Sequence, residues 1–322
     1  MILNKVHHKD FLNNDLPDKC AKLIIADPPY FKVKGEFDFI WKTFEDYLVD
    51  VEKWCLECKR ILADNGTLLW YGDAKNIAYA QIIFDKHFNL INNLTWNKGS
   101  FMGLEESEGL RSFAPCTERI LMYSNMNDYQ DNQLYIEPMI NIRNYLNNER
   151  KKARLTLDEM CAFCGLNDKG HGGIAYHWCS SKQPTMIPEK HYKTLQGTGF
   201  FKKAYSELRK EYEDLRKEYE ELRRPFNNQF NLQEVLNFSN EQAKTGAKYD
   251  HDTVKPEKLT RALILTCSRK NDLIVVPFVG SGTECAMSAK EKRPFIGYEI
   301  TEKHAKMAQD RVNKILNTLT LF

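Results

Sequence analysis

Short apolar runs alternate with amphipathic segments over the first third of the chain. Residues 22–26 form an apolar run that stops at two prolines, which predicts the end of a buried strand. Residues 43–62 follow with apolar positions three and four apart, as in a helix. Further strands are predicted at 67–71, 90–96 and 119–124, with a helix at 74–87. This alternation is typical of an α/β domain with a mainly parallel sheet.

The same alternation returns near the end of the chain after a long interruption. Residues 126–247 are polar and predict shorter helical segments. The pattern then resumes with strands predicted at 273–278 and 294–300, each followed by a helix. We therefore predict one α/β domain with a doubly wound, mostly parallel sheet, made of residues 1–125 and 248–322, and a mainly helical insert between them.

Composition limits the class of protein. The 322 residues carry a net charge of +2, so a nucleic-acid surface must be local rather than spread over the molecule. No apolar run approaches the roughly 18 residues of a membrane span. The nine scattered cysteines fit reduced thiols, and Cys161-x-x-Cys164 fits a helix face better than a zinc site. We expect a cytoplasmic protein without a membrane partner.

A glycine-containing turn follows the predicted strand at 273–278. Gly280, Ser281 and Gly282 separate this strand from the next helix, and glycines let a ligand approach the backbone closely. The next strand ends near Glu299, where an acidic side chain can accept hydrogen bonds from ribose hydroxyls. A tight turn without a ligand is the alternative, but the turn and the acidic strand end together favour a ligand that contains a ribose.

Asp27-Pro28-Pro29-Tyr30 follows the first predicted strand. An amine that attacks a methyl group needs acceptors that hold its hydrogens and aim its lone pair. The Asp27 carboxylate and the Pro28 carbonyl can supply them. The prolines stiffen the loop, and the Tyr30 ring can stack on a planar base removed from a duplex. A rigid turn without catalytic function is the alternative.

These two motifs together resemble the amino-methyltransferases of DNA, in the permuted beta group in which DPPY precedes the glycine loop. The resemblance implies S-adenosylmethionine as cofactor and the 6-amino group of adenine in double-stranded DNA as acceptor. Asp27, Pro28, Pro29 and Tyr30 would form the catalytic loop. The implied cofactor-binding residues are Asp10, Lys255, Pro256, Phe278, Gly280, Ser281, Gly282, Thr283 and Glu299. Residues 95–98, 117–120 and 251–256 also resemble family segments.

The resemblance implies direct methyl transfer to a flipped base, without a metal or a covalent enzyme intermediate. Two positions depart from the family pattern, Val276 where Asp is usual and Glu284 where a second Thr is common. Two alternatives stay open: methylation of the 4-amino group of cytosine, or a non-catalytic DNA-binding protein with a degenerate methyltransferase fold. A cognate restriction endonuclease acting separately would be a partner of such an enzyme.

Residues 155–195 of the insert resemble helix-turn-helix segments that recognise the target in some phage and bacterial adenine methyltransferases. Thr156 and Glu159 fit a helix capping box. Residues 150–203 contain ten Lys and Arg against four Asp and Glu, which suits phosphate contacts, although a solvated basic surface is the alternative. We expect the reading helix to start near Ser181. The predicted DNA contacts are Lys151, Lys152, His177, Ser180, Ser181, Lys182 and Gln183.

A heptad pattern follows this segment. Tyr205, Tyr212 and Tyr219 recur every seven residues, and each is followed three residues later by a leucine. The pattern predicts a helix over about residues 201–224 with an apolar stripe. Because three heptads make a marginal isolated coiled coil, two interpretations stay open: the stripe packs on its own chain, or it pairs two chains in a homodimer.

Overall fold

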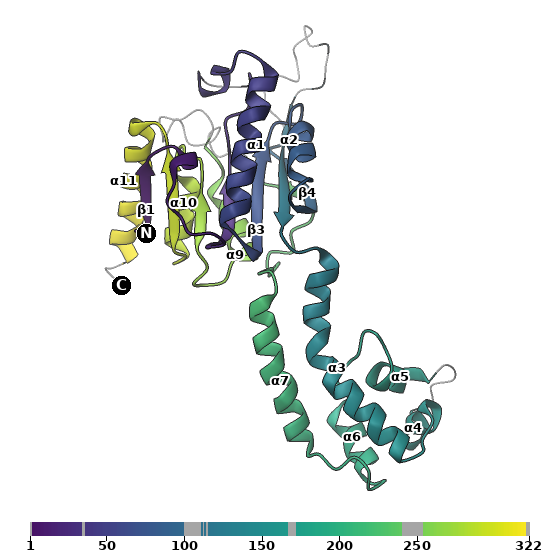
Figure 1. Ribbon diagram of the computed structural model, residues 1–322. Helices are drawn as coiled ribbons and strands as arrows, with labels where there is room; N and C mark the ends of the chain where they lie inside the picture. Colours follow the sequence, from purple (N-terminus) through teal and green to yellow (C-terminus); the bar gives the residue numbers. More distant parts are fainter. Residues whose placement is uncertain are drawn as a thin grey trace. The chain divides into compact units, whose positions relative to one another are not determined.

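The computed structural model describes residues 2–33, 36–99, 111, 113, 115–166, 172–239 and 254–319. The chain divides into two compact units (Figure 1). The first unit combines residues 1–127 and 224–322, and the second contains residues 128–223. Within the described residues, no helix is long and apolar enough to cross a membrane.

A sheet forms the centre of the first unit. Its strands are β1 (Lys5–His8), β2 (Ala21–Ala26), β3 (Leu62–Gly72), β4 (Asn89–Asn97), β5 (Thr117–Ser124), β6 (Val235–Asn237), β7 (Ile274–Val276) and β8 (Phe295–Glu299). Their spatial order is β1-β8-β7-β2-β3-β5-β4-β6. Only the two pairs made by β5 are antiparallel among these strands. The prediction of a doubly wound, mostly parallel sheet is confirmed.

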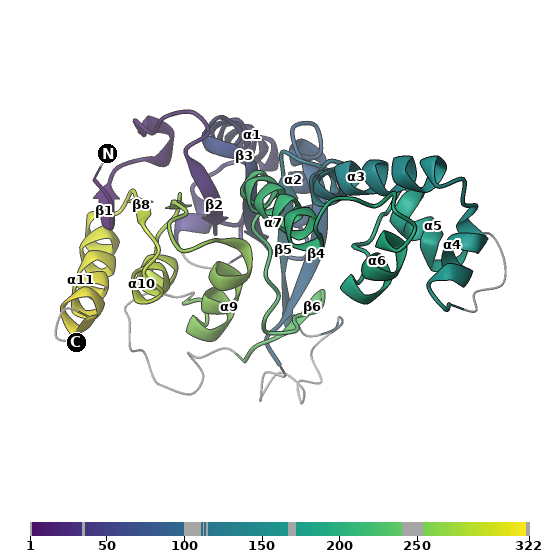
Figure 2. The same ribbon diagram turned by 90° about the horizontal axis from the view of Figure 1, so that it is seen from below.

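Helices cover both faces of this sheet. They are α1 (Phe44–Ile61), α2 (Ile77–Phe84), α9 (Glu257–Cys267), α10 (Thr283–Lys290) and α11 (Glu302–Leu319). Figure 2 shows α1 and α2 on one face and α9, α10 and α11 on the other. Side chains alternate between the faces: Ile24 and Trp70 pack under α1 and α2, whereas Ile25 and Tyr71 pack on the opposite face.

Two edge strands were not predicted. In β1 only Val6 is buried, and in β6 only Leu236 is buried. Neither strand therefore has an apolar alternation long enough to be predicted from the sequence. Each is held by pairing with one neighbour, β1 with β8 and β6 with β4. Because β6 belongs to the sheet, the insert boundary predicted at residue 247 moves to Arg223.

The second unit is helical. Its helices are α3 (Asp128–Lys152), α4 (Leu157–Phe163), α5 (Gly173–Cys179), α6 (Glu189–Gln196) and α7 (Tyr205–Leu222). Here α3 is longer than the short helical segments expected from the sequence. The predicted capping box is present at the start of α4, where Thr156 and Glu159 exchange hydrogen bonds. A core of its own, including Leu146, Trp178 and Tyr192, holds the unit together.

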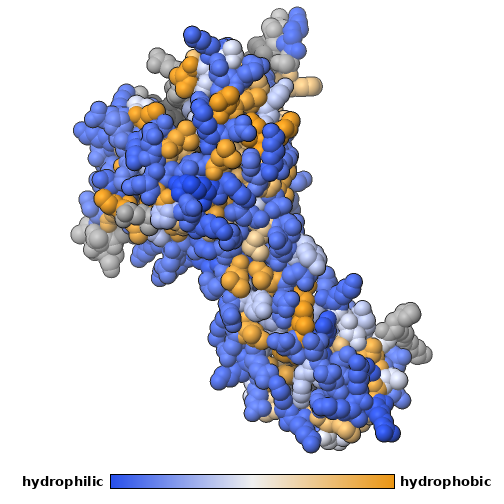
Figure 3. Space-filling view, in the orientation of Figure 1, coloured by the Kyte–Doolittle hydropathy of each residue, from blue (hydrophilic) through white to orange (hydrophobic). Residues whose placement is uncertain are grey.

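The heptad helix α7 packs against α3 of the same chain (Figure 1). Leu208 is fully buried, and Tyr205 and Tyr212 pack against the core of the second unit. Farther along the stripe, Leu222 is 53% exposed. The structure therefore supplies an intrachain partner for most of the stripe. On the face drawn in Figure 3, each unit carries a mostly hydrophilic surface with small separate apolar patches.

Candidate active site

A cleft of about 640 Å³ lies at the carboxyl ends of the parallel strands of the first unit. Asp27 directly follows β2, Pro277 directly follows β7, and Glu299 ends β8. Because β5 runs antiparallel, its first residue, Thr117, lines the same cleft. Ten of the predicted site residues line it: Asp10, Asp27, Pro28, Pro29, Tyr30, Lys255, Phe278, Gly280, Ser281 and Glu299.

Asp27 is held from both of its carboxylate oxygens. The Tyr30 hydroxyl donates a hydrogen bond to Oδ1 at 2.5 Å, and the Lys255 ammonium lies 2.8 Å from Oδ2. The Asp27 side chain is 18% exposed, so one side of it still faces the cleft. A carboxylate offers about four acceptor positions, and these two contacts leave others for a substrate amine.

Lys255 joins Asp27 to a second carboxylate that the sequence analysis did not assign. Its Nζ lies 3.3 Å from Glu118 Oε2, and Lys98 lies 3.1 Å from Glu118 Oε1. The Lys255 side chain is only 4% exposed, and the rings of Tyr71 and Trp96 lie 5.2 and 5.9 Å from its ammonium. A buried cation is retained where charges and aromatic faces replace its water. Lys255 thus fixes the position of the Asp27 carboxylate.

Burial and charge act against each other in this network. Burial raises the pKa of the Asp27 carboxyl, and the Lys255 ammonium opposes that rise. For Glu118, burial also acts to raise the pKa, but Lys255 and Lys98 outweigh it and hold the pKa below its usual range. The two ammonium groups therefore keep Glu118 ionised, while Asp27 becomes a stronger base than an exposed carboxylate.

The glycine loop is tied to the end of β8 by Glu299. The Gly280 amide donates to Glu299 Oε2 at 2.8 Å, and the Thr301 amide donates to Oε1 at 2.9 Å. The carboxylate is fixed at the mouth of the cleft, and each oxygen keeps a further lone pair for a ligand hydroxyl. A left-handed conformation at Gly280, with φ of 50°, brings its amide toward this carboxylate.

Three predicted cofactor residues do not line the cleft. Gly282 has φ of 80° and precedes α10, and an added Cβ would lie 2.7 Å from Ala308 Cβ, so it lets α10 pack closely on α11. Thr283 is fully buried, and its hydroxyl accepts a hydrogen bond from Arg311 at 3.0 Å. Pro256 caps the start of α9. These three residues therefore support the helices and the loop beside the cleft without facing the cleft themselves.

Asp10 and Phe278 line the cleft from opposite segments of the chain. The Asp10 side chain accepts a hydrogen bond from the Leu12 amide and so caps the short 3-10 helix η1 (Phe11–Asn13). The Phe278 ring meets the edges of Phe11 and Trp54, with centroids 6.2 and 5.0 Å apart. Together they give this end of the cleft an aromatic wall beside a carboxylate. His251, Asp252 and Thr253, also part of the resemblance, lie outside the described residues.

The predicted DNA contacts lie in the second unit. Lys151 and Lys152 are exposed at the end of α3, where Lys152 pairs with Glu149 at 2.5 Å. His177 is exposed on α5. The segment 180–183 follows α5 in a connection to α6, so the helix expected to start near Ser181 is absent there among the described residues.

Ser181 differs from its neighbours in that connection. Its side chain is buried at 6% exposure, its hydroxyl accepts a hydrogen bond from the Gln183 amide, and its carbonyl accepts one from Arg143. Ser180, Lys182 and Gln183 are exposed. The buried serine therefore holds the connection in shape, while the other three side chains face solvent.

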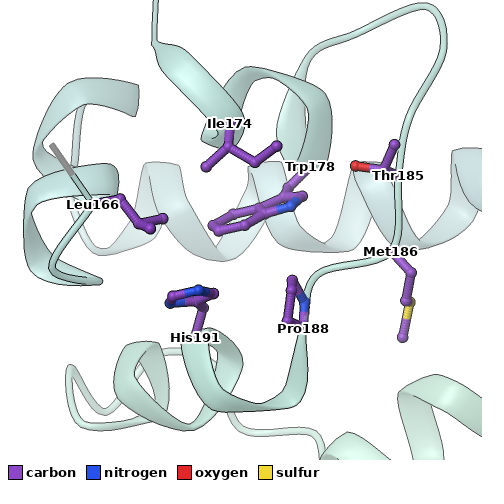
Figure 4. A pocket seen from close by; sticks show the side chains of 7 residues that line it. All are labelled: Leu166, Ile174, Trp178, Thr185, Met186, Pro188 and His191. Carbon is purple, nitrogen blue, oxygen red and sulfur yellow. The ribbon is translucent and has the colours of Figure 1, made fainter. Parts of the chain in front are cut away.

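The second unit has a small hollow of about 400 Å³ (Figure 4). Trp178 and His191 stack in it, with ring centroids 5.7 Å apart and an angle of 29°. The remaining lining is largely apolar and comes from Leu166, Ile174, Thr185, Met186 and Pro188. It lies between α5 and α6, and its described lining contains no Asp, Glu, Lys or Arg, unlike the cleft of the first unit.

Comparison with known proteins assigns the chain to a family. A family model described as DNA methylase matches residues 21–310, which includes both the DPPY loop and the glycine loop. The chain belongs to the DNA methylase family. The predicted resemblance to DNA methyltransferases is thereby confirmed, whereas the choice of adenine over cytosine stays a prediction.

Curated DNA methyltransferases resemble the chain over most of its length. The DNA adenine methyltransferase YhdJ of Escherichia coli is 23% identical, with 92% of this chain and 78% of the relative covered. The type II methyltransferase M1.MboII of Moraxella bovis is 24% identical over 99% of this chain and 98% of its own length. The type II methyltransferase M.HpaI of Haemophilus parainfluenzae is 23% identical, with 94% and 71% covered.

Solved structures share the fold. A Thermus thermophilus protein assigned as a DNA modification methylase, complexed with S-adenosyl-L-methionine, matches with a TM-score of 0.52 at 16% identity, covering 97% of this chain and 95% of its own. The cytosine-N4-specific PvuII DNA methyltransferase matches with a TM-score of 0.53 at 12% identity, covering 98% and 91%. These likenesses show that the chain shares the fold of both proteins.

Proposed function

We propose that this DNA methylase transfers a methyl group from S-adenosylmethionine to the exocyclic 6-amino group of adenine in double-stranded DNA. The observation that carries the proposal is that the DPPY loop and the glycine loop line the same cleft. The Asp27 carboxylate, anchored by Tyr30 and Lys255, lies in the same cleft as the glycine loop that Glu299 holds. A methyl donor and an amine acceptor can therefore meet there.

The cleft fits the cofactor in size and chemistry. Its volume of about 640 Å³ lies within the range of roughly 300–1,000 Å³ that small-molecule pockets occupy. Glu299 presents a fixed carboxylate for ribose hydroxyls, and the aromatic wall at Phe278 suits an adenine ring. Asp10 offers a carboxylate at the same end. When bound, S-adenosylmethionine supplies an electrophilic methyl group.

The residues of the DPPY loop position the acceptor. The Asp27 carboxylate accepts a hydrogen from the amine and directs the nitrogen lone pair toward the cofactor side of the cleft. Lys255 and Tyr30 fix its orientation, and the adjacent prolines limit movement of the loop. The amine loses one proton overall during methylation. Asp27, with its raised pKa, is the nearby group suited to take that proton.

Two observations favour adenine over cytosine as the methylated base. An Asp-Pro-Pro loop is typical of adenine-specific enzymes in the family that the chain resembles, and the relatives include the adenine methyltransferase YhdJ.

Methyl transfer from cofactor labelled in its methyl group to double-stranded DNA tests the enzymatic activity. An absence of transfer, with DNA binding retained, would support the degenerate, non-catalytic alternative. Asp27→Ala serves as the inactive control.

We further propose that the second unit recognises the DNA target. Lys151 and Lys152 would contact phosphates, while His177 and the exposed side chains at 180, 182 and 183 would approach base edges. Replacing both lysines by glutamine should weaken binding to all sequences and flatten the salt dependence, because fewer counterions are released. Gln183→Ala should change which DNA sequence is methylated, because each lost base contact removes about 1–3 kcal/mol of discrimination against the wrong base.

Binding titrations at several salt concentrations and methylome sequencing separate these two effects. If all three substitutions leave both the salt slope and the methylated site unchanged, this unit does not read DNA.

Assembly and partners are part of the proposal. Because α7 packs on α3 of its own chain, we infer that the heptad stripe needs no second copy, and light scattering during chromatography should report a monomer. A dimer that Leu215→Glu dissociates would contradict this.

The type II relatives favour a separate restriction endonuclease as cellular partner, and methylated DNA should then resist that nuclease.

A further inference from the structure

Glu284 is a buried carboxyl group that the proposed mechanism does not use. It is the second residue of α10, its exposure is 4%, and it lines the same cleft as Asp27. Its Oε1 atom is inaccessible and has no hydrogen-bond partner among the described residues. An unpartnered carboxyl oxygen is costly to bury, so its retention beside a ligand cleft points to a partner that arrives with the ligand.

The cations near Glu284 are already committed to other groups. Lys255 pairs with Asp27 and Glu118, and Arg311 pairs with Glu257 at 2.7 Å. Five charged or titratable groups interact electrostatically with Glu284. They are Asp27 after β2, Lys255 before α9, Arg311 on α11, Tyr71 on β3 and Cys285 on α10.

Charge balance shows what Glu284 adds. In the buried network, the carboxylates of Asp27 and Glu118 are matched by the ammonium groups of Lys98 and Lys255. An ionised Glu284 would leave one unmatched negative charge. Burial, followed by repulsion from Asp27, raises the pKa of Glu284 to about 7 despite its place at the start of a helix. With a pKa of about 7, Glu284 is mostly the neutral acid below pH 7, and an arriving cation would favour the carboxylate.

We propose that Glu284 is the counter-charge for the sulfonium of S-adenosylmethionine and releases its proton to solvent when that cofactor binds. This inference rests on the proposed function. When the cofactor is bound, its methyl group would have to face the amine held by Asp27, and the sulfonium would then lie in the part of the cleft that Asp27 and Glu284 both line. Methyl transfer turns the sulfonium into a neutral thioether. Glu284 then takes up a proton from solvent, and the product loses the charge attraction that held its precursor.

Calorimetry of the full-length protein between pH 5.5 and 8.5 tests this without measuring turnover. Affinity for S-adenosylmethionine should rise by up to about tenfold per pH unit below pH 7 and level off above it, because binding is linked to one ionisation. Titrations in two buffers of different ionisation enthalpy should show proton release. S-adenosylhomocysteine, which lacks the sulfonium, should bind with an affinity that hardly changes over the same range.

Two variants identify the titrating group. The near-isosteric Glu284→Gln should remove the pH dependence for S-adenosylmethionine, whereas Asp27→Asn should keep it. Equal pH dependence for both ligands in the wild type, or retention of the dependence in Glu284→Gln, would overturn the inference. Because the wild-type comparison needs no variant, a Glu284→Gln protein that fails to fold leaves the test decisive. If the wild type binds neither ligand, the proposed function itself fails.

Discussion

Replacing Lys255 by methionine should destabilise the first unit in a pH-dependent way. The change removes the ammonium that lies 2.8 Å from Asp27 and 3.3 Å from Glu118, and it leaves an apolar chain of similar length at a position that is 4% exposed. Removing one partner of a buried ion pair costs about 3–5 kcal/mol, because the remaining charge is left without compensation. We expect a loss of this size at pH 8.

The sign of the pH dependence follows from Asp27. Its pKa is already raised by burial, and loss of Lys255 raises it further. When the pKa of a carboxyl is higher in the folded protein than in the unfolded chain, the folded protein loses stability as the pH rises. The loss begins at the pKa of the unfolded chain, near 4, and continues up to the pKa of the folded protein. Each pH unit in that window costs about 1.4 kcal/mol, and the wild type shares part of this cost, so at pH 5 the substitution should cost no more than about that much through Asp27.

Urea unfolding of wild type and variant at pH 5 and pH 8 measures both values. Lys258→Met is the matched control, because Lys258 lies three residues along the chain, is exposed at the start of α9, and should change stability by less than about 0.5 kcal/mol at either pH. A loss that is equal at the two pH values, or smaller than about 1 kcal/mol at pH 8, would refute the view of Lys255 as the buried ion-pair partner of Asp27.

Three further substitutions probe other parts of the protein. Asp27→Ala should lower methyl transfer by on the order of 100-fold or more while cofactor affinity by calorimetry changes little, because one positioned acceptor of the amine is lost. Gly282→Ala should lower the melting temperature more than Gly99→Ala, since both glycines have φ of 80° but only the Cβ at 282 meets a neighbour; equal shifts would contradict close packing of α10 on α11. Leu208→Ala should lower the free energy of unfolding, measured in urea, by about 2–5 kcal/mol, because Leu208 is fully buried. The exposed Leu222→Ala should lower it by less than about 0.5 kcal/mol. Similar losses in the two variants would argue against α7 packing on its own chain.

The two motifs of the cleft were predictable because each lies where a buried strand ends. Asp27 follows an apolar run stopped by prolines, and the glycine loop follows another, so their placement at one sheet edge follows from parallel strand order. The roles of Lys98 and Glu118 were not predictable in the same way. Their segments resembled the family, but only the antiparallel pairing of β4 with β5 brings the two side chains together.

The limits of prediction differ in the second unit. The heptads indicated α7 correctly, but its partner α3 has no comparable repeat and shares only tertiary contacts with it. Ser181 was predicted to contact DNA because it was placed near the start of a reading helix, yet its hydroxyl and carbonyl both accept hydrogen bonds within the second unit. Polarity predicts a hydrogen bond, and only the fold decides whether its partner is the protein or DNA.

Analysis of modified nucleosides tests the central claim most directly. Double-stranded DNA is incubated with the purified protein and cofactor labelled in its methyl group, then digested to nucleosides and separated. The account predicts that the label appears in N6-methyladenine and that Asp27→Ala removes it. Label in N4-methylcytosine would contradict the adenine assignment while keeping the catalytic cleft. Absence of label from DNA, with the protein folded and the cofactor bound, would contradict the proposed function.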